Sequence, residues 1–343
     1  MAQTLEQIAA AMVADHKGLL AADESNASIK KRFDAVGVTN TEENRRDYRE
    51  FMFRTTEAMQ KYISGVILYD ETIRQKAKDG TKLVDIITKM GSMPGIKVDT
   101  GAKPLIGFPG ETLTEGLDGL DARMKEYYEL GARFAKWRAV IEIGRKGDPQ
   151  IPTRYAVKAN NYALARYAAI CQANGIVPMV EPEVLMDGDH TIERCQEVTE
   201  AVLSDLFAQL SAARVKLEGL ILKPNMVISG VMAPKRVGVD EVAERTVKTF
   251  LRTVPAATAG IMFLSGGQSD EEATAHLSAM NAGFKTPWAL SYSYGRALQA
   301  AAQKAWSGKP DNVAAGQKAF LHRAKMNSLA AAGKWKKDLE KAA

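Results

Sequence analysis

The chain alternates between short apolar runs and longer segments with helical spacing of apolar residues. Each short run is hydrophobic at nearly every position, as expected for a strand buried on both sides of a parallel sheet. We predict eight strands, at Lys17–Asp23, Ile63–Asp70, Pro94–Thr100, Arg133–Ile141, Ile176–Glu183, Glu218–Asn225, Gly260–Gly266 and Trp288–Tyr294. Strand alternating with helix eight times predicts a (β/α)₈ TIM barrel, and the length of 343 residues suits that fold.

The segments between the strands predict helices from apolar residues three and four positions apart. The predicted helices are Thr41–Tyr62, Arg123–Leu130, Ala163–Ala173, Ile192–Leu217, Val239–Leu251 and Glu271–Met280. The first of them has the spacing of a capping box at Thr39 and Glu42. The stretch Gly144–Asn160 has no regular pattern, and we predict a surface excursion there.

No linker rich in Gly, Pro or Ser divides the chain, so we expect a single domain over residues 1–343. The barrel is expected at about residues 15–305, and the Ala- and Lys-rich tail at about 306–343 is expected to form helices outside it. An open doubly wound sheet is the alternative architecture. It is disfavoured because no strand is followed by a Gly-x-Gly-x-x-Gly or Walker-type loop.

Composition indicates an ordinary globular protein of the cytoplasm. Hydrophobic residues make up 46% of the chain and charged residues 25%. The apolar runs are too short to span a bilayer, and the N-terminus does not resemble a signal peptide. The two cysteines, Cys171 and Cys195, form no disulfide framework, which fits a reducing compartment.

The net charge of +5 leaves two interpretations open. The protein is either mildly basic without functional consequence, or it has a cleft that attracts a small polyanion. Nucleic acid is a less suitable partner because Lys and Arg are scattered among acidic residues. The four histidines and two cysteines show no zinc-ligand spacing, so we predict no metal site.

Charged and hydroxyl side chains recur at the predicted C-terminal ends of the strands, where barrel enzymes carry their functional residues. Alternate strand residues share a face, so Lys136 and Arg138 are expected to point the same way, as are Glu181 and Glu183. Packing is a poor explanation for this set because buried charges cost several kcal/mol each unless they pair. The set consists of Asp23, Lys97, Lys136, Arg138, Glu181, Glu183, Lys223, Ser265, Ser293 and Arg296.

Lys223 ends an apolar run, Gly219–Leu222, that would desolvate its amine. A second cation nearby, for which Lys136 is the candidate, would further favour the neutral amine that Schiff-base chemistry requires. Glu181 and Glu183 could act as a proton donor and a proton acceptor, because two close carboxylates resist ionising together. Ion pairing within this group is the structural alternative. For Asp23 the alternative is a helix N-cap.

Two groups of residues suggest binding sites for phosphate. Ser265-Gly266-Gly267 follows the seventh strand and Gly295-Arg296 follows the eighth, and these loops hold phosphate in many barrels. A second phosphate could lie on a cationic cluster elsewhere, although a solvated helix face at Lys30–Arg32 is the alternative. That cluster consists of Ser25, Ser28, Lys31, Arg32 and Lys97.

Seven motifs together resemble class I fructose-bisphosphate aldolases, in the same order along the chain, from about residue 15 to about residue 332. They are Leu20-Ala21-Ala22-Asp23-Glu24-Ser25, Gly95-Ile96-Lys97-Val98-Asp99, Ala135-Lys136-Trp137-Arg138, Val180-Glu181-Pro182-Glu183, Leu222-Lys223-Pro224-Asn225-Met226, Phe263-Leu264-Ser265-Gly266-Gly267-Gln268-Ser269 and Ser293-Tyr294-Gly295-Arg296.

The resemblance implies a role for each matching catalytic position. Lys223 would be the lysine that attacks the C2 carbonyl of the ketose. Glu181 would be the general acid and base that dehydrates the carbinolamine, and Asp23 would assist cleavage through the C4 hydroxyl. Lys136 and Glu183 would be the charge partners of Lys223 and Glu181.

The resemblance also implies which residues bind the substrate. Arg138 would be a further cation of the site. The C1 phosphate would contact Ser265, Gly266, Gly295 and Arg296, with Gly267 and Ser293 included in the substrate-binding set. The other phosphate would contact Ser25, Ser28, Lys97, Lys31 and Arg32.

The implied activity is the reversible cleavage of fructose 1,6-bisphosphate to dihydroxyacetone phosphate and glyceraldehyde 3-phosphate, in glycolysis and gluconeogenesis. The resemblance also implies a lyase that needs no metal or other cofactor, and a homotetramer by analogy. One departure stands out, since animal members end in a tyrosine that transfers a proton and no Tyr follows Tyr294 here. The alternatives are a transaldolase, a deoxyribose-phosphate aldolase, a scaffold without activity, and a disfavoured zinc-dependent aldolase.

Overall fold

A computed structural model of the chain describes residues 3–144 and 151–341. Eight parallel strands form a sheet in the order β1-β10-β9-β8-β7-β6-β3-β2, and β1 pairs with both β2 and β10. The sheet is therefore closed, which confirms the predicted (β/α)₈ barrel and contradicts the open doubly wound sheet. The strands are β1 (Gly18–Ala22), β2 (Ile63–Leu68), β3 (Met93–Lys97), β6 (Phe134–Ile141), β7 (Val177–Val184), β8 (Ile221–Leu222), β9 (Gly260–Phe263) and β10 (Leu290–Tyr294).

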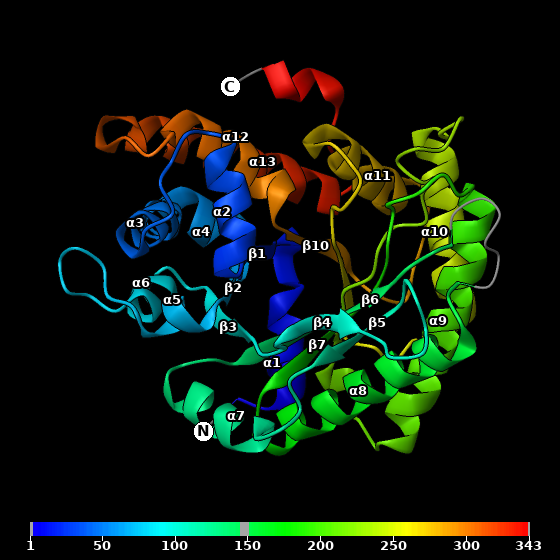
Figure 1. The fold of residues 1–343 in the computed structure, drawn as a ribbon. Helices are drawn as coiled ribbons and strands as arrows, with labels where there is room; N and C mark the ends of the chain where they lie inside the picture. The colour runs from blue at the N-terminus through cyan, green and yellow to red at the C-terminus, as the bar shows by residue number, and fades with distance from the viewer. Residues whose placement is uncertain (1–2, 145–150, 342–343) are drawn as a thin grey trace.

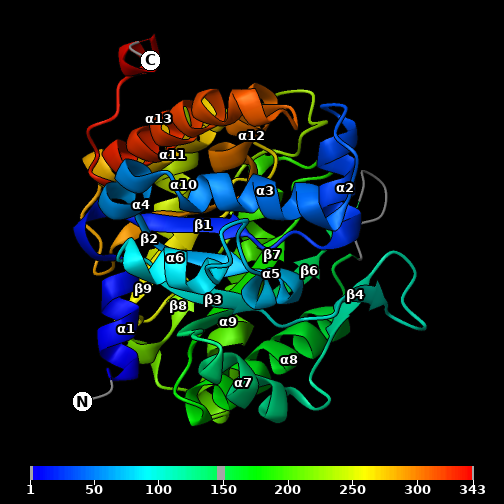
Figure 2. The ribbon, with the colours of Figure 1, turned by 90° about the vertical axis from the view of Figure 1, so that its left-hand side faces the viewer.

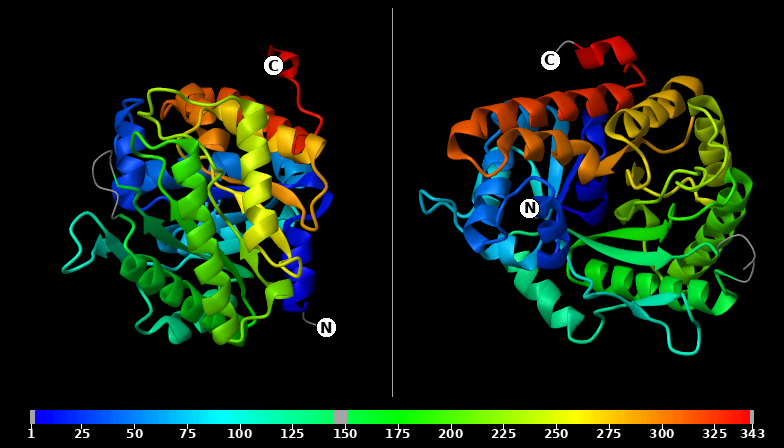
Figure 3. Two further views of the ribbon diagram at one scale, coloured as in Figure 1. Left: turned by 90° about the vertical axis from the view of Figure 1, so that its right-hand side faces the viewer. Right: turned by 45° about the horizontal axis from the view of Figure 1, so that its top comes forward.

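The helices form a ring around the strands, as Figures 1 and 3 show from different sides. They are α1 (Leu5–Met12), α2 (Asn26–Asp34), α3 (Glu42–Phe53), α4 (Thr56–Tyr62), α5 (Asp70–Arg74), α6 (Leu83–Lys89), α7 (Leu120–Glu129), α8 (Arg154–Ala173), α9 (Ile192–Ala212), α10 (Val239–Thr253), α11 (Asp270–Gly283), α12 (Arg296–Trp306) and α13 (Val313–Ala331). Short 3₁₀ helices occur at η1 (Ala14–His16), η2 (Leu217–Gly219), η3 (Pro310–Asn312) and η4 (Lys337–Lys341). Within the described ranges, no helix is long and apolar enough to cross a membrane.

The prediction of one long helix at Thr41–Tyr62, with a capping box at Thr39, is wrong in two respects. It is divided into α3 and α4, because Thr55 has a ψ of 79°, outside the helical region. The helix also begins at a different residue, since the Thr41 hydroxyl, and not Thr39, accepts the Asn44 N–H at 3.2 Å. A cap depends on which side chain reaches a free N–H, and the spacing of residues alone did not decide this.

Two further features differ from the predictions. Helix α8 begins at Arg154, so the later part of the stretch predicted as a surface excursion is helical, while residues 145–150 lie outside the described residues. Between β3 and β6 the chain also forms an antiparallel hairpin of β4 (Gly101–Pro104) and β5 (Thr112–Glu115), which was not predicted. Strand β4 is mostly exposed, β5 is mostly half-buried, and neither carries a continuous apolar run.

Strand β6 shows how alternation separates the inside of the barrel from the outside. Ala135 and Trp137 pack into the large hydrophobic cluster between the strands and the helices. Phe134 belongs to a second, smaller cluster inside the barrel, and Lys136 and Arg138 face the cavity at the mouth of the barrel. One strand therefore supplies an apolar side chain to the base of the barrel and charged side chains to its mouth.

The base of the barrel interior is apolar and closed. Helix α1 packs against η2, β2 and β7, and Figure 2 shows it at one end of the barrel. The side chains of the interior cluster are apolar, so their burial stabilises the fold through the hydrophobic effect. The interior cluster consists of Ile8, Ala9, Met12, Leu19, Ala21, Ile67, Phe134, Val177, Met179, Ile221 and Met262.

The C-terminal helices lie outside the barrel, as predicted. Helix α13 packs against α12 and α11, and Figure 2 shows it crossing that side of the molecule. Beyond it, the carboxylate of Glu340 binds Arg323 at 2.7 Å and His322 at 2.9 Å, and it also accepts a hydrogen bond from Trp335. These contacts attach the 3₁₀ helix η4 to α13.

Tight packing at the base of the barrel predicts that Gly95 cannot be replaced without a loss of stability. A Cβ atom at Gly95 would lie 2.2 Å from the ring of Phe134, so only glycine leaves room for this side chain. We expect Gly95→Ala to destabilise the protein by about 1–3 kcal/mol through overpacking. Urea unfolding followed by circular dichroism measures the change.

Gly283→Ala is the matched control, because a Cβ atom there meets nothing within 4 Å. It is expected to be neutral or to stabilise the helix by up to about 1 kcal/mol. Adding Phe134→Leu to Gly95→Ala should recover part of the loss. Equal stability of the Gly95 and Gly283 variants would contradict the proposed role of Phe134.

Candidate active site

A cavity of about 840 Å³ lies at the C-terminal ends of the barrel strands. The predicted site residues that line it are Asp23, Ser25, Ser28, Arg32, Lys97, Lys136, Arg138, Glu181, Glu183, Lys223, Ser265, Gly266, Ser293, Gly295 and Arg296. Two predicted residues do not line it. Lys31 is exposed on α2, and Gly267 packs instead against Met186.

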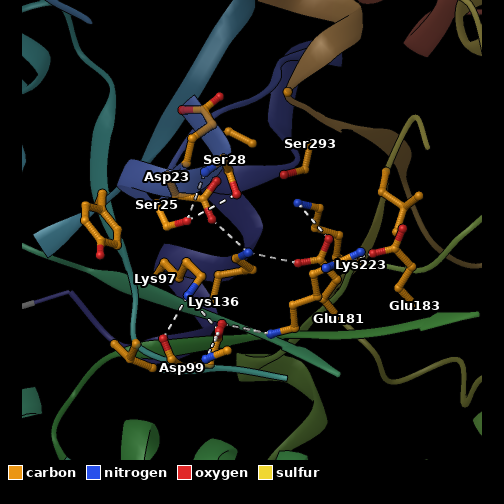
Figure 4. A pocket seen from close by; sticks show the side chains of 18 of the residues that line it. Asp23, Ser25, Ser28, Lys97, Asp99, Lys136, Glu181, Glu183, Lys223 and Ser293 are labelled. Carbon is orange, nitrogen blue, oxygen red and sulfur yellow. Dashed lines mark hydrogen bonds and ion pairs between the residues drawn. The ribbon is translucent and has the colours of Figure 1, made fainter. Parts of the chain in front are cut away.

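Four side chains from four strand ends form a continuous chain of ion pairs in the centre of the cavity (Figure 4). Lys136 Nζ lies 2.8 Å from Asp23 and 3.1 Å from Glu181 Oε2. Lys223 Nζ lies 3.1 Å from the other oxygen of the same carboxylate, Glu181 Oε1. Two cations and two anions therefore alternate in the order Asp23, Lys136, Glu181, Lys223.

The charges of this chain hold one another ionised. Burial raises the pKa of Asp23, but Lys136 and Lys223 outweigh that effect and lower it to about 2. Burial likewise opposes the positive charge of Lys136, but Asp23 and Glu181 raise the pKa of this amine above its ordinary value. Asp23 is thus a carboxylate at neutral pH. It is also not the cap of α2, because Ser25 holds that position.

Of the two interpretations of the carboxylate pair, ion pairing is the one that describes Glu181. Burial raises the pKa of Glu181, but the combined effect of Lys136, Lys223 and Arg138 lowers it below its ordinary value. Glu183 has a separate cation, since its carboxylate forms an ion pair with Arg138. Each carboxylate therefore has a cation of its own beside it, and repulsion between the two is not the dominant influence.

Lys97 and Asp99 extend the charged surface from β3. Lys97 Nζ lies 2.7 Å from Asp99 Oδ1 and donates to the Asp99 carbonyl at 2.8 Å. The other carboxylate oxygen of Asp99 accepts the backbone N–H of Arg138 at 3.2 Å. These bonds link the end of β3 to β6 and hold the Lys97 amine at the cavity, where Figure 4 shows both residues.

The loops after β9 and β10 have the features of an anion site. Helix α12 begins at Arg296, and its first turn has no side-chain cap, so its N–H groups can bind an anion. Ser293 is almost completely buried, and its hydroxyl has no hydrogen-bond partner among the described residues. Ser265 and Gly266 line the same part of the cavity. A buried hydroxyl without a partner is costly unless a ligand satisfies it.

The residues near the start of α2 form a second polar group at the cavity. The hydroxyls of Ser25 and Ser28 lie 3.1 Å apart. Arg32 lines the cavity and forms an ion pair with Glu24 at 2.5 Å. The cluster predicted from the sequence is thus present, except for Lys31.

Comparisons with known proteins agree with this geometry. Residues 4–343 match the family described as fructose-bisphosphate aldolase class-I. The chain belongs to this family. A relative from Xanthomonas campestris pv. campestris, named "Probable fructose-bisphosphate aldolase class 1", is 58% identical and matches over 97% of this chain and 99% of its own length. The fructose-bisphosphate aldolase of Dictyostelium discoideum is 51% identical over 97% of this chain and 93% of its own.

Two further matches are a plant relative and a solved structure. "Fructose-bisphosphate aldolase 4, cytosolic" from Arabidopsis thaliana is 54% identical over 94% of this chain and 81% of its own length. A solved structure of the Plasmodium falciparum fructose-bisphosphate aldolase, in complex with TRAP and a small molecule inhibitor, is 48% identical, with a TM-score of 0.94. It covers 97% of this chain and 95% of the other. As a member of the aldolase family, the protein is an enzyme of the lyase class.

Several residues at the aldolase cavity were not predicted as site residues. Asp99 could have been found, because it lies two positions after Lys97 and strand alternation puts the two on one face. Arg123 and Tyr127 line the cavity from α7, and Arg123 donates to the Val98 carbonyl at 3.0 Å. Nothing in their spacing distinguishes them from an ordinary helix surface, since only the path of the chain after β3 brings α7 here.

The chain of ion pairs predicts a pH-dependent loss of stability in Lys136→Met. The variant leaves Asp23 and Glu181 buried without their shared cation, and we expect a cost of about 3 kcal/mol near pH 7. The folded-state pKa values of both carboxylates would rise, so protonation would restore stability to the variant as the pH falls. The deficit relative to the unchanged protein should therefore be smaller near pH 5.

Urea midpoints measured at the two pH values test this expectation. The matched control is Lys30→Met, which removes an amine 2.7 Å from Asp34 in a pair with side chains 60% and 55% exposed. That change should cost less than about 1 kcal/mol at either pH. A deficit for Lys136→Met that grows as the pH falls would contradict the arrangement.

Proposed function

We propose that the protein cleaves fructose 1,6-bisphosphate reversibly to dihydroxyacetone phosphate and glyceraldehyde 3-phosphate through a Schiff base on Lys223. The observation that carries the proposal is the position of the Lys223 amine, buried in the cavity and 3.1 Å from a carboxylate oxygen of Glu181. A lysine amine next to a group that can transfer protons is the arrangement needed to form an iminium ion. Membership of the aldolase family supports the same chemistry.

The first stage of the proposed reaction joins the substrate to Lys223. Glu181 takes a proton from the Lys223 ammonium, and the resulting neutral amine attacks the C2 carbonyl and forms a carbinolamine. Glu181, which contacts the Lys223 nitrogen, then returns this proton to the carbinolamine hydroxyl, and the hydroxyl leaves as water. The product is a protonated iminium ion, which can accept an electron pair from the neighbouring C3–C4 bond.

The second stage breaks that bond. Asp23 is ionised at neutral pH and takes the proton of the C4 hydroxyl, directly or through Lys136 at 2.8 Å. The C3–C4 electron pair moves to the iminium nitrogen, glyceraldehyde 3-phosphate departs, and an enamine stays on Lys223. Protonation at C3 and hydrolysis then release dihydroxyacetone phosphate and return the free amine.

Two phosphate-binding ends favour a bisphosphate over a substrate with one phosphate. In our proposal the C1 phosphate contacts Ser265, Gly266, Ser293, Gly295 and Arg296. The other phosphate contacts Ser25, Ser28, Lys97 and Arg32, all of which line the same cavity. Both phosphates would anchor the substrate in this cavity, so remote binding orients the carbons that react.

We propose further that the enzyme is a single-domain protein that works in the cytoplasm, in glycolysis and gluconeogenesis, as a homotetramer. The cytosolic Arabidopsis relative supports the compartment. Independence of metal is also proposed. It is supported by membership of the class-I aldolase family.

Reduction with borohydride in the presence of dihydroxyacetone phosphate tests the Schiff base. We expect a stable adduct on the peptide that contains Lys223, identified by mass spectrometry, and the same yield when a chelator is present. Lys223→Met should give no adduct and no cleavage. Lys216→Met is the control, because this lysine is exposed and pairs with Glu6 away from the cavity. An adduct on another lysine would sink the assignment.

Steady-state kinetics with fructose 1,6-bisphosphate test the phosphate end at α12. Arg296→Ala removes one charge-assisted hydrogen bond, and we expect KM to rise by about tenfold or more. Lys31→Ala is the matched control, since this cation does not line the cavity. Its KM should change by less than about twofold. The opposite ranking of the two variants would move the phosphate site away from Arg296.

A further inference from the structure

The loop between β9 and α11 contains a tight turn from Ser265 to Gln268, closed by the Gln268 N–H on the Ser265 carbonyl at 3.3 Å. The two middle residues are Gly266 and Gly267, and Gly267 has a φ of +71°. A Cβ atom at either position would lie within 2.4 Å of Met186, so the close approach of Met186 requires both glycines. Their N–H groups have no partner within residues 3–144 and 151–341.

Two adjacent glycines give the backbone of this turn a wide range of accessible conformations. Glycine loses more conformational freedom than any other residue when its backbone is fixed. If the phosphate had to order the turn when it bound, the entropy lost by the turn would weaken binding. A turn that is already ordered before the phosphate binds avoids this loss of affinity. Contacts on the side of the turn away from the cavity therefore affect how well the turn can bind an anion.

A buried histidine makes such a contact. His276 lies on α11 and is 5% exposed, and its Nδ1 lies 2.6 Å from the side-chain oxygen of Gln268. The amide nitrogen of Gln268 is buried and has no partner among the described residues. In the part of the chain that the structure describes, the bond to His276 is therefore the only one that holds this carboxamide.

The contact is made by a neutral ring. Burial lowers the pKa of His276 to about 4, and Arg236 adds to that effect while Glu272 opposes it. At neutral pH the ring is neutral and carries one N–H. In the tautomer with this proton on Nδ1, the ring donates a hydrogen bond to the Gln268 side-chain oxygen. The bond therefore holds the turn without adding charge beside the anion site.

Two exposed side chains hold the same loop from outside. Arg236 donates to the Gly267 carbonyl at 3.2 Å and lies 3.7 Å from Glu272. Glu272 in turn accepts the N–H of Ser269 at 2.8 Å and completes the capping box of α11. These contacts fix the Gly267 carbonyl and the end of the loop, but they are solvated, and the buried contact at Gln268 has the greater effect.

We propose that His276 and Gln268 are positioning residues, which hold the Ser265–Gln268 turn with the Gly266 N–H ready for the C1 phosphate. The inference rests on the proposed function, because it assigns these residues to the phosphate of that substrate. Neither residue lines the cavity, and each acts through the backbone of the turn. Neither residue belongs to the site residues predicted from the sequence.

Dihydroxyacetone phosphate carries a single phosphate and tests this end alone. The measurement is the initial rate of borohydride trapping on Lys223 as the concentration of this ligand is varied. We expect His276→Leu to raise the half-saturating concentration about threefold to tenfold, the range for one neutral hydrogen bond, and to leave the maximal rate unchanged. Leucine keeps a side chain of similar bulk and has no donor.

His276→Asn is the rescuing variant, because the amide nitrogen of asparagine occupies nearly the position of histidine Nδ1. It should restore most of the lost affinity. Gln268→Met, which removes the carboxamide from the other side of the bond, should reproduce the effect of His276→Leu. The double variant should be no weaker than either single variant, since both changes break one interaction.

The outcomes separate this inference from the proposed function. An unchanged half-saturating concentration in His276→Leu and Gln268→Met overturns the positioning role, and so does a failure of asparagine to rescue. If His276→Leu does not fold, Gln268→Met alone decides in the same way. Arg296→Ala is measured in parallel. If trapping occurs and only Arg296→Ala weakens it, the inference fails and the aldolase proposal stands, whereas absence of trapping in the unchanged protein refutes the aldolase proposal itself.

Discussion

The shared carboxylate of Glu181 is the interaction on which the site depends. Two lysines from different strands, Lys136 and Lys223, each lie 3.1 Å from one of its oxygens. Two buried amines without a counter-charge would repel each other and would cost several kcal/mol to desolvate. With Asp23 on the other side of Lys136, the four groups carry no net charge. Because the charges balance, the barrel can bury a reactive amine at its C-terminal end without a large loss of stability.

The rest of the barrel makes that concentration of charge tolerable. The same strands that present charge at the mouth present apolar side chains at the base, where α1 closes the interior. Packing at the base is tight enough that Gly95 must lack a side chain beside Phe134. Stability is thus supplied at one end and chemistry at the other, as the barrel architecture allows. The glycine turn after β9 repeats the pattern, since its outer side is held by His276 and its inner side faces the cavity.

The sequence predicted the elements better than the contacts between them. Alternation correctly placed Lys136 and Arg138 on the inner face of β6, with Trp137 on the outer face. It did not indicate that Arg138 would pair with Glu183 while Lys136 pairs with Glu181. The choice between proton sharing and ion pairing stayed open for this reason, because the effect of the three cations on the Glu181 pKa depends on distances that strand spacing does not contain. The break in the helix at Thr55 and the β4–β5 hairpin were missed because neither has an apolar pattern of its own.

The sequence by itself determined the repeating strand and helix pattern, the closed-barrel class and the residues that lie at the strand ends. Those properties follow from local periodicity, because burial on both faces of a strand needs continuous apolar residues and function needs polar residues beyond them. The tertiary structure alone decided which charges pair, that Lys31 points away from the cavity, and that Arg123 and Tyr127 from α7 line it. It also decided the contact between His276 and Gln268. These residues are eight positions apart in the sequence, and His276 Nδ1 lies 2.6 Å from the side-chain oxygen of Gln268. Pairing energies depend on distance and burial in space, and both are set by how the barrel closes.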